Sequence, residues 1–166
     1  MVIGTRSIRA IVALATALLC IGLAAAPVGA QAQVTSGEFG PLDVPALEVG
    51  GHATMVRTAD GRTKIDAHVE GLEPGRTYPA HVHNLPCGTS RGGGHYQDTA
   101  GAGTTPPNEL WPSDDPRDPL AKITANDAGV ARGNGTAEWT ARAEAQSVVI
   151  HQWDDAAVRI ACADLV

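Results

Sequence analysis

The feature of this 166-residue chain that most restricts its fold is an alternation of apolar and polar residues in short runs that end at turns. Residues 52–72 contain two such runs, HATMVRT and RTKIDAHVEGL, on either side of a turn that contains Gly61. A period of two is typical of a strand with one buried face, and glycine suits the positive φ of a tight turn. The stretch predicts a β-hairpin in which Ile65, Ala67 and Val69 face the core.

The same signals continue to the end of the chain. Further strands are expected at residues 77–83, 146–153 and 157–165, with a second hairpin over residues 120–140 that turns at NDAG. Residues 31–50 have little pattern and are expected to form a leader or a first edge strand. No segment longer than TARAEAQ has helical spacing. Many short strands separated by turn signals predict one all-β domain, a sandwich or a flattened barrel, over residues 31–166.

Residues 1–30 are expected to be a secretory signal peptide. Arg6 and Arg9 precede the apolar run AIVALATALLCIGLAAA, and small residues follow it, which is the order of a cleaved leader. We place the cut after Ala30, with Ala32 as the alternative. An uncleaved membrane anchor is the competing interpretation, but the run is shorter than the about 20 residues that a spanning helix needs. We therefore expect an exported domain with no membrane span after cleavage, either secreted or held in the periplasm or cell envelope.

Charge and cysteine content narrow the class of partner. The leader holds two of the 12 basic residues and none of the 18 acidic ones, so the mature chain has a net charge of about −8. Such a charge argues against a nucleic-acid partner and against an anionic membrane surface. Cys87 and Cys162 remain after cleavage, and an even, small count in an exported chain favours one disulfide. Two unpaired buried thiols are the alternative.

Histidines are the candidate metal ligands. His81 and His83 are two positions apart in a predicted strand, so both rings should lie on one face. His95 follows three glycines in an irregular stretch at about residues 84–119, which is too long for an ordinary connection. His151 ends the apolar run SVVI. Four imidazoles from two strands and a loop suit Cu(II), although a pair such as HVH also occurs as solvated strand residues.

Several motifs together resemble the copper/zinc superoxide dismutases. They are GLEPGRTYPAHVHNLPCG, GGGHYQD, ITANDAGVA, VVIHQWDD and RIAC, in this order over about residues 45–164. The resemblance implies an eight-stranded Greek-key β-barrel with long loops, and it implies copper as the cofactor. It is closer to the copper-only members of the family, for the two reasons given below.

The resemblance also assigns roles to residues. It implies that His81, His83 and His151 are permanent copper ligands and that His95 takes the bridging position, where it supplies a proton during turnover. It implies a disulfide between Cys87 and Cys162. Arg159, in RIAC, matches the arginine that lies beside copper and guides the superoxide anion.

Two departures from the family pattern bear on the chemistry. No histidine lies between His95 and His151, so we expect no zinc bound in the family manner. The acids of PPNELWPSDD stand there instead, and we favour Glu109 over Asp114 and Asp115 as the group that orients the His95 ring; solvated acids are the alternative. The second departure is the seven-residue spacing QWDDAAV before Arg159, which predicts a shallow, open site.

These features predict an exported copper-dependent superoxide dismutase that acts on superoxide as a small-molecule substrate. A copper-binding or copper-buffering protein on the same scaffold is the alternative, and a structural domain without metal is a third reading. Asp154 and Asp155 lie close in sequence to His151 and argue against high activity, because they would repel an anion. His52 and His68 are expected to be solvent-facing.

The three tryptophans have no firm place in this scheme. Trp111, Trp139 and Trp153 are expected to pack in the core or against loops. Trp153 is two positions after His151, so it is the one expected to wall the copper pocket.

Overall fold

A computed structural model describes residues 31–44 and 47–166. The expected signal peptide, residues 1–30, lies outside the described residues. The structure therefore does not test the expected cleavage after Ala30 or after Ala32. The strands are β1 (Gln33–Pro41), β2 (Gly50–Arg57), β3 (Thr63–Glu70), β4 (Thr77–Tyr78), β5 (Ala80–His83), β6 (Ile123–Thr124), β7 (Ala131–Ala137), β8 (Ser147–His151) and β9 (Arg159–Asp164). One short 3₁₀ turn, η1, spans Ser90–Gly92. The all-β prediction is confirmed, and the described residues contain no α-helix.

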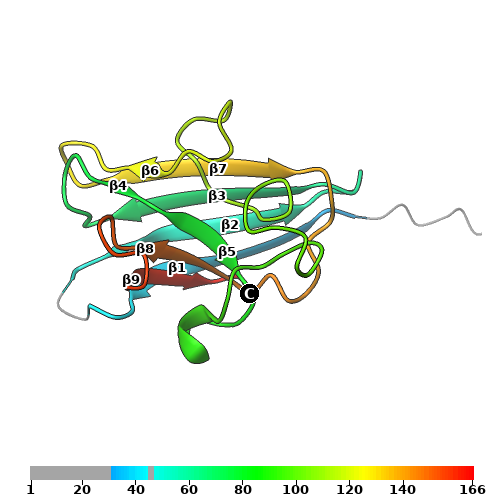
Figure 1. The fold of residues 1–166 in the computed structure, drawn as a ribbon, viewed down its shortest axis with the longest axis horizontal. Helices are drawn as coiled ribbons and strands as arrows, with labels where there is room; N and C mark the ends of the chain where they lie inside the picture. The colour runs from blue at the N-terminus through cyan, green and yellow to red at the C-terminus, as the bar shows by residue number, and fades with distance from the viewer. Residues whose placement is uncertain (1–30, 45–46) are drawn as a thin grey trace, which may run out of the picture.

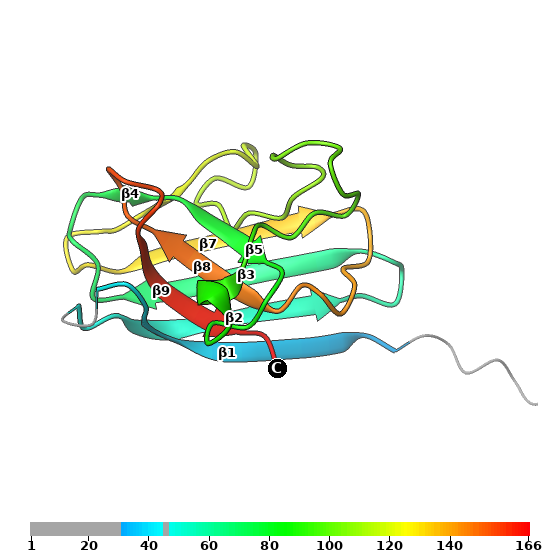
Figure 2. The same cartoon turned by 60° about the horizontal axis from the view of Figure 1, so that its bottom comes forward.

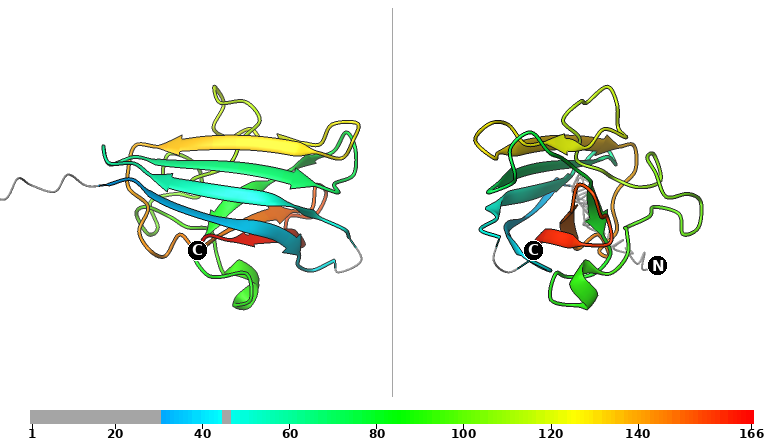
Figure 3. Two further views of the ribbon diagram at one scale, coloured as in Figure 1. Left: turned by 180° about the vertical axis from the view of Figure 1, so that it is seen from behind. Right: turned by 60° about the vertical axis from the view of Figure 1, so that its left-hand side comes forward.

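Seven of the strands form one antiparallel sheet in the order β5-β8-β9-β1-β2-β3-β7, and β4 pairs with β6 in a small second sheet (Figure 1). The order β9-β1-β2-β3 places the last strand beside the first, and the connection from β7 at one edge to β8 near the other edge crosses between the two ends of the sheet, as Greek-key connections do. The large sheet curls around its core as a half-barrel, as the end-on view in Figure 3 shows. The eight strands expected from the resemblance become nine because the strand at 77–83 is divided into β4 and β5.

The first predicted hairpin is present with the expected inward face. β2 pairs with β3 from Gly50 opposite Glu70 to Arg57 opposite Thr63. Ile65, Ala67 and Val69 are buried, as the alternation predicted. The largest fully buried apolar side chains of the sheet come from both of its ends and include Met55, Ile65, Val148, Ile150 and Ile160.

The second predicted hairpin has its turn where expected but different partners. Asn126 accepts the N–H of Gly129 at 2.9 Å, so the chain turns within NDAG. Its two strands then diverge, because β6 pairs with β4 while β7 pairs with β3. Local alternation predicted the strands, but the pairing follows from which sheet edge each strand reaches.

The gap between the two ends of the half-barrel is bridged by a short loop segment, residues 109–113. Leu110 O accepts the N–H of Val82 in β5 at 3.0 Å. Three residues on, Ser113 and Asn134 of β7 exchange two backbone hydrogen bonds of 3.0 and 2.7 Å. The segment therefore ties the edge strands β5 and β7 together, and the green and yellow-green loops crossing that side are visible in Figure 2.

A disulfide joins the sheet to the loop after β5. Cys87 and Cys162 are bonded, with Cα atoms 5.8 Å apart. Cys162 lies in β9, and the N–H of Cys87 also donates to Asp164 Oδ1 at 2.7 Å. The predicted pairing is confirmed. In the described part of the chain, no helix has the length and apolarity needed to cross a membrane.

Candidate metal centre

The candidate centre lies on the outer face of β5 and β8, beneath the loop that follows β5. In β5, Ala80 and Val82 belong to the hydrophobic core. His81 and His83 alternate with them and so point to the opposite face, where they are nevertheless buried. The strand is covered on both sides, by the core and by the loop.

Glycine lets that loop approach the sheet closely. Gly92 has φ of +90°, and a Cβ placed there would lie 3.0 Å from Val149 Cγ2 and 3.7 Å from His83 Cβ. Any other residue would be strained in this conformation and would push the loop away from β8. His95 follows on the same loop, and its backbone forms a bridge with His83.

His151 and Arg159 come from neighbouring strands. A bulge between Ile150 and His151 shifts the register of β8 so that His151 lies opposite Arg159 of β9. Ile150 remains in the core, and His151 is turned to the side of the other three histidines. The alternation of β8 is enough to place His151 on that face, and the bulge leaves Ile160 of β9 unpaired, so that Arg159 and not Ile160 lies opposite His151.

The fold brings the four predicted histidines together. Each of His81, His83, His95 and His151 offers one ring nitrogen, and these four atoms all lie within 4.8 Å of one another. Ring centroids are 4.0 Å apart for His81 and His95 and 5.4 Å apart for His83 and His151. This is the one cluster of three or more potential metal-binding side chains within residues 31–44 and 47–166.

The hydrogen bonds at the far side of each ring determine which nitrogen faces the centre. His83 Nδ1 lies 3.3 Å from Gly93 O, and His151 Nδ1 lies 2.7 Å from Ala156 O. Because carbonyl oxygens only accept, both Nδ1 atoms donate, and both Nε2 atoms of the neutral rings carry lone pairs. These two Nε2 atoms face each other at 3.3 Å. Two facing lone pairs repel, and a cation bound by both relieves that repulsion.

Glu109 fixes the third ring in the same way. Its Oε2 accepts from His95 Nδ1 at 2.8 Å, which leaves His95 Nε2 free to bind a metal. Glu109 is only 2% exposed, and its Oε1 accepts from Gln97 Nε2 at 3.3 Å. Of the three acids considered from sequence, Glu109 is therefore the one beside His95, while Asp114 and Asp115 lie further along the loop, where Asp115 pairs with the exposed Arg117.

The buried rings are held neutral. Burial, followed by repulsion from the neighbouring imidazoles, lowers the pKa of His81 to about 2 and that of His83 to about 3. Burial also lowers the pKa of His151 to about 4, although its hydrogen bond to Ala156 acts in the opposite direction. Neutral imidazole is the form that binds metal.

These properties fit a copper ion. His81 Nδ1 is buried with no hydrogen-bond partner, and one ring nitrogen of His81 lies within 4.8 Å of the ligand nitrogens of the other three histidines. Four imidazole nitrogens form a donor set that Cu(II) prefers. His95 is the most accessible of the four, with a side chain 31% exposed, so the centre has an open side.

The guanidinium of Arg159 is held by the same loop. Its Nη1 donates to Arg91 O at 2.6 Å and lies 3.4 Å from Ser90 O. Ser90 and Arg91 have φ of 46° and 56°, a conformation that costs energy in residues other than glycine and is concentrated at functional sites. The strained turn is what aims both carbonyls at Arg159.

An acid that the sequence did not single out completes this arrangement. Asp43 Oδ2 accepts the backbone N–H of Arg159 at 2.8 Å and pairs with Arg91 Nη1 at 2.7 Å. Its burial alone would raise its pKa, but the hydrogen bonds from Arg159 and Arg91 lower that pKa overall. No local pattern marks Asp43, because it reaches the site only through the pairing of β1 with β9.

Other residues weighed from sequence lie elsewhere. His52 and His68 face each other across β2 and β3 on the outer face, with ring centroids 5.3 Å apart. His52 is exposed as expected, but His68 is half-buried because His52 and Glu70 cover it, so its expected solvent-facing position is only partly correct. Trp153 packs under Arg76, whose Cζ lies 3.9 Å from the ring centroid. The tryptophan that contacts a histidine of the cluster is Trp111, 4.7 Å from His81 between centroids.

Comparison with known proteins identifies the scaffold. No protein-family model matches the chain, and no curated protein is similar to it in sequence. Among solved structures, a single-substitution variant of superoxide dismutase 5 from Candida albicans matches with a TM-score of 0.54 and 16% identity, over 78% of this chain and 86% of that one. A double-substitution variant of a superoxide-dismutase-like protein from Bacillus subtilis matches with a TM-score of 0.50 and 17% identity, over 79% and 96%. The chain has the superoxide-dismutase-like fold. The resemblance seen in the motifs is thereby confirmed for the fold. The fold carries a four-histidine cluster suited to bind a metal such as copper.

Proposed function

We propose that this protein is an exported copper-dependent superoxide dismutase that converts superoxide to O₂ and H₂O₂ without the family's zinc site. His81, His83, His95 and His151 are the proposed copper ligands. The observation that supports this most is the convergence of four imidazole nitrogens within 4.8 Å, with Arg159 directly opposite His151 across β8 and β9. A domain that used these residues only for packing would have no need of facing lone pairs.

Bound copper would supply one-electron redox chemistry, which zinc and calcium do not offer. The residues of the chain do the rest. Arg159 gives a small anion a docking partner at the open side, since its guanidinium is fixed by two carbonyls. Glu109 holds the Nδ1 proton of His95, so His95 Nε2 is the atom that can take up or release a proton when it is not bound to metal.

An extracytoplasmic location accompanies this proposal. The Cys87–Cys162 disulfide is the kind of bond that persists in oxidising compartments. The expected leader at residues 1–30 is consistent with export.

Copper buffering on the same scaffold is the second candidate. It is favoured by Asp43, whose carboxylate contacts the backbone of Arg159 and the side chain of Arg91 and so reduces the positive field at the open side. The acidic mature chain acts in the same direction. A buffer would bind copper tightly without turning over superoxide.

The test is to load the purified protein with copper and to follow superoxide decay. We expect copper-dependent turnover that falls about tenfold in Arg159→Ala, which is the lower range of electrostatic guidance. Arg117→Ala is the matched control, because it removes the same charge from a side chain that is 88% exposed, and it should turn over like the wild type. Tight copper binding without turnover in the wild type would favour the buffer, and failure to bind copper would reject both functions.

A further inference from the structure

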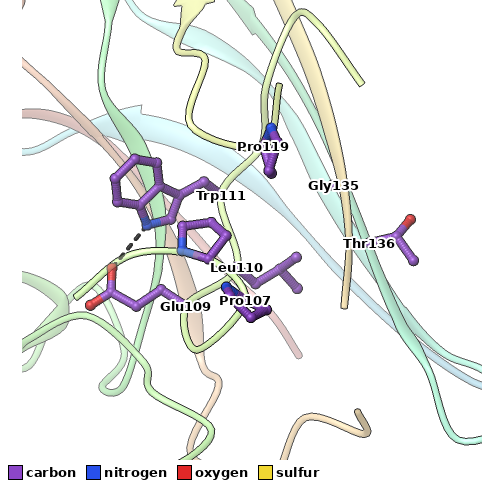
Figure 4. A pocket seen from close by; sticks show the side chains of 8 residues that line it. Pro107, Glu109, Leu110, Trp111, Pro119, Gly135 and Thr136 are labelled. Carbon is purple, nitrogen blue, oxygen red and sulfur yellow. Dashed lines mark hydrogen bonds between the residues drawn. The ribbon is translucent and has the colours of Figure 1, made fainter. Parts of the chain in front are cut away.

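The side chain of Trp111 connects two of the clustered histidines. Its indole Nε1–H donates to Glu109 Oε2 at 2.9 Å (Figure 4). The same oxygen accepts from His95 Nδ1 at 2.8 Å. The indole ring also packs edge-on against His81, with centroids 4.7 Å apart. Trp111 therefore contacts one histidine directly and a second through a single carboxylate.

The burial of Glu109 means that its carboxylate depends on hydrogen bonds from the protein and not from water. A carboxylate that is 2% exposed must be satisfied by donors within the protein. Oε2 receives two N–H groups, from Trp111 and His95, and Oε1 receives the longer bond from Gln97. The indole is thus the donor that keeps Oε2 in line with the His95 ring. Without it, the carboxyl group can rotate about its last side-chain bond.

The backbone around Trp111 is fixed on both sides. Leu110 O accepts a hydrogen bond from the backbone N–H of Val82, which lies between His81 and His83 in β5. Ser113 exchanges two backbone hydrogen bonds with Asn134 of β7. The indole is therefore placed by two strands and not by a free loop, which is how a supporting residue holds a site in one geometry.

We infer that Trp111 is a positioning residue: its N–H orients Glu109, and Glu109 in turn holds His95 in the tautomer that presents Nε2 to the metal. Its link to turnover rests on the proposed function, but its effect on His95 is a property of the protein without metal. The two ideas can therefore fail separately.

The test uses Trp111→Phe, which keeps an aromatic ring against His81 and removes only the donor. Trp139→Phe is the matched control, since the Trp139 indole also donates one hydrogen bond, to Pro107 O at 2.7 Å, and packs on Tyr96. Long-range ¹⁵N–¹H spectra of the metal-free protein report which ring nitrogen of His95 carries the proton. We expect the Nδ1–H tautomer alone in wild type and in Trp139→Phe, and a mixture of both tautomers in Trp111→Phe.

A second measurement covers the case in which Trp111→Phe does not fold. In Glu109→Gln, the indole N–H resonance of Trp111 should move while that of Trp139 stays in place. Unchanged tautomers in a folded Trp111→Phe protein, or an unmoved Trp111 resonance in Glu109→Gln, would overturn the inference.

Copper supplies an independent readout. Loss of a group that supports a metal ligand typically weakens metal binding by about 10- to 100-fold. We expect Trp111→Phe to lose Cu(II) to a chelator about tenfold faster than wild type and to show an altered Cu(II) EPR spectrum, whereas Trp139→Phe should match wild type in both. Identical release and identical spectra in all three proteins would count against a positioning role, whether or not any of them turns over superoxide.

Discussion

At the scale of the residue, the site is organised by the far side of each imidazole. Gly93, Ala156 and Glu109 each accept a hydrogen bond from the Nδ1 of one histidine, and the three Nε2 atoms face the centre as a result. In the zinc-binding members that the resemblance implies, a second metal would lie beside His95. In this protein the buried carboxylate of Glu109 lies there instead. A carboxylate accepts a hydrogen bond from Nδ1, whereas a cation would replace the proton there, so the Nδ1 side of His95 faces Glu109 and not a second metal.

Burial of these rings predicts how stability depends on pH. The pKa values of His81, His83 and His151 are lowered to about 2, 3 and 4, whereas unfolded histidine titrates near pH 6.5. Between pH 6.5 and about 4 the unfolded chain binds more protons than the folded one. The free energy of unfolding of the copper-free protein should therefore fall as the pH falls through this range, by up to about 1.4 kcal/mol per pH unit for each of these histidines.

Urea unfolding at several pH values between 7.5 and 4.5 measures this dependence. His151→Gln should give a shallower dependence than wild type, because one buried ring is removed. His52→Gln, which removes an exposed ring on another face, should leave the slope unchanged. A stability that is constant over this range would contradict the assignment of neutral buried rings.

At the scale of the element, the site depends on segment 109–113 lying close against β7. The carbonyl of Trp111 passes over Gly135, where an added Cβ would lie 2.5 Å from that oxygen and 3.2 Å from Ile65 Cγ2. A strand of the sequence ARGNGTA looks weak by propensity, but its glycines leave room for the loop. The composition of β7 is thus set by the segment that packs on it.

Gly135→Ala should destabilise the protein by about 1–3 kcal/mol, the usual cost of overpacking, because the nearest atoms belong to backbone and core. It should also displace Trp111 and so weaken copper binding. Thermal unfolding and a chelator competition measure the two effects. Gly40→Ala in β1 is the control, since a Cβ there meets nothing within 4 Å; equal behaviour of the two variants would show that the close approach is unimportant.

At the scale of the whole molecule, the disulfide closes a loop of 75 residues that contains most of the site. Cys87 begins the loop that carries His95, and Cys162 lies in β9 beyond Arg159. The disulfide therefore holds the loop that covers the site to β9, the strand that carries Arg159.

Replacement of both cysteines by serine should lower the free energy of unfolding by roughly 4 kcal/mol, by the loop-entropy relation for a loop of this length. Copper should also be lost more readily, because the loop over β8 is released. Denaturant unfolding with and without copper measures both effects. A variant as stable as wild type would mean that the native packing, and not the bond, fixes this loop.

The sequence by itself determined the strands, the inward residues of the first hairpin and the four histidines. These follow from period-two alternation and from residue chemistry, which are local and can be read one segment at a time. Glu109 was also the favoured partner of His95, although Asp114 and Asp115 in the same loop remained as alternatives.

Only the tertiary structure decided the rest. Asp43 reaches Arg159 through the pairing of β1 with β9, and Trp111 reaches Glu109 and His81 because segment 109–113 bridges β5 and β7. The second hairpin separated into two sheets for the same reason. Contacts between distant segments depend on which strand edges are open once the sheet has curled, and no local periodicity carries that information.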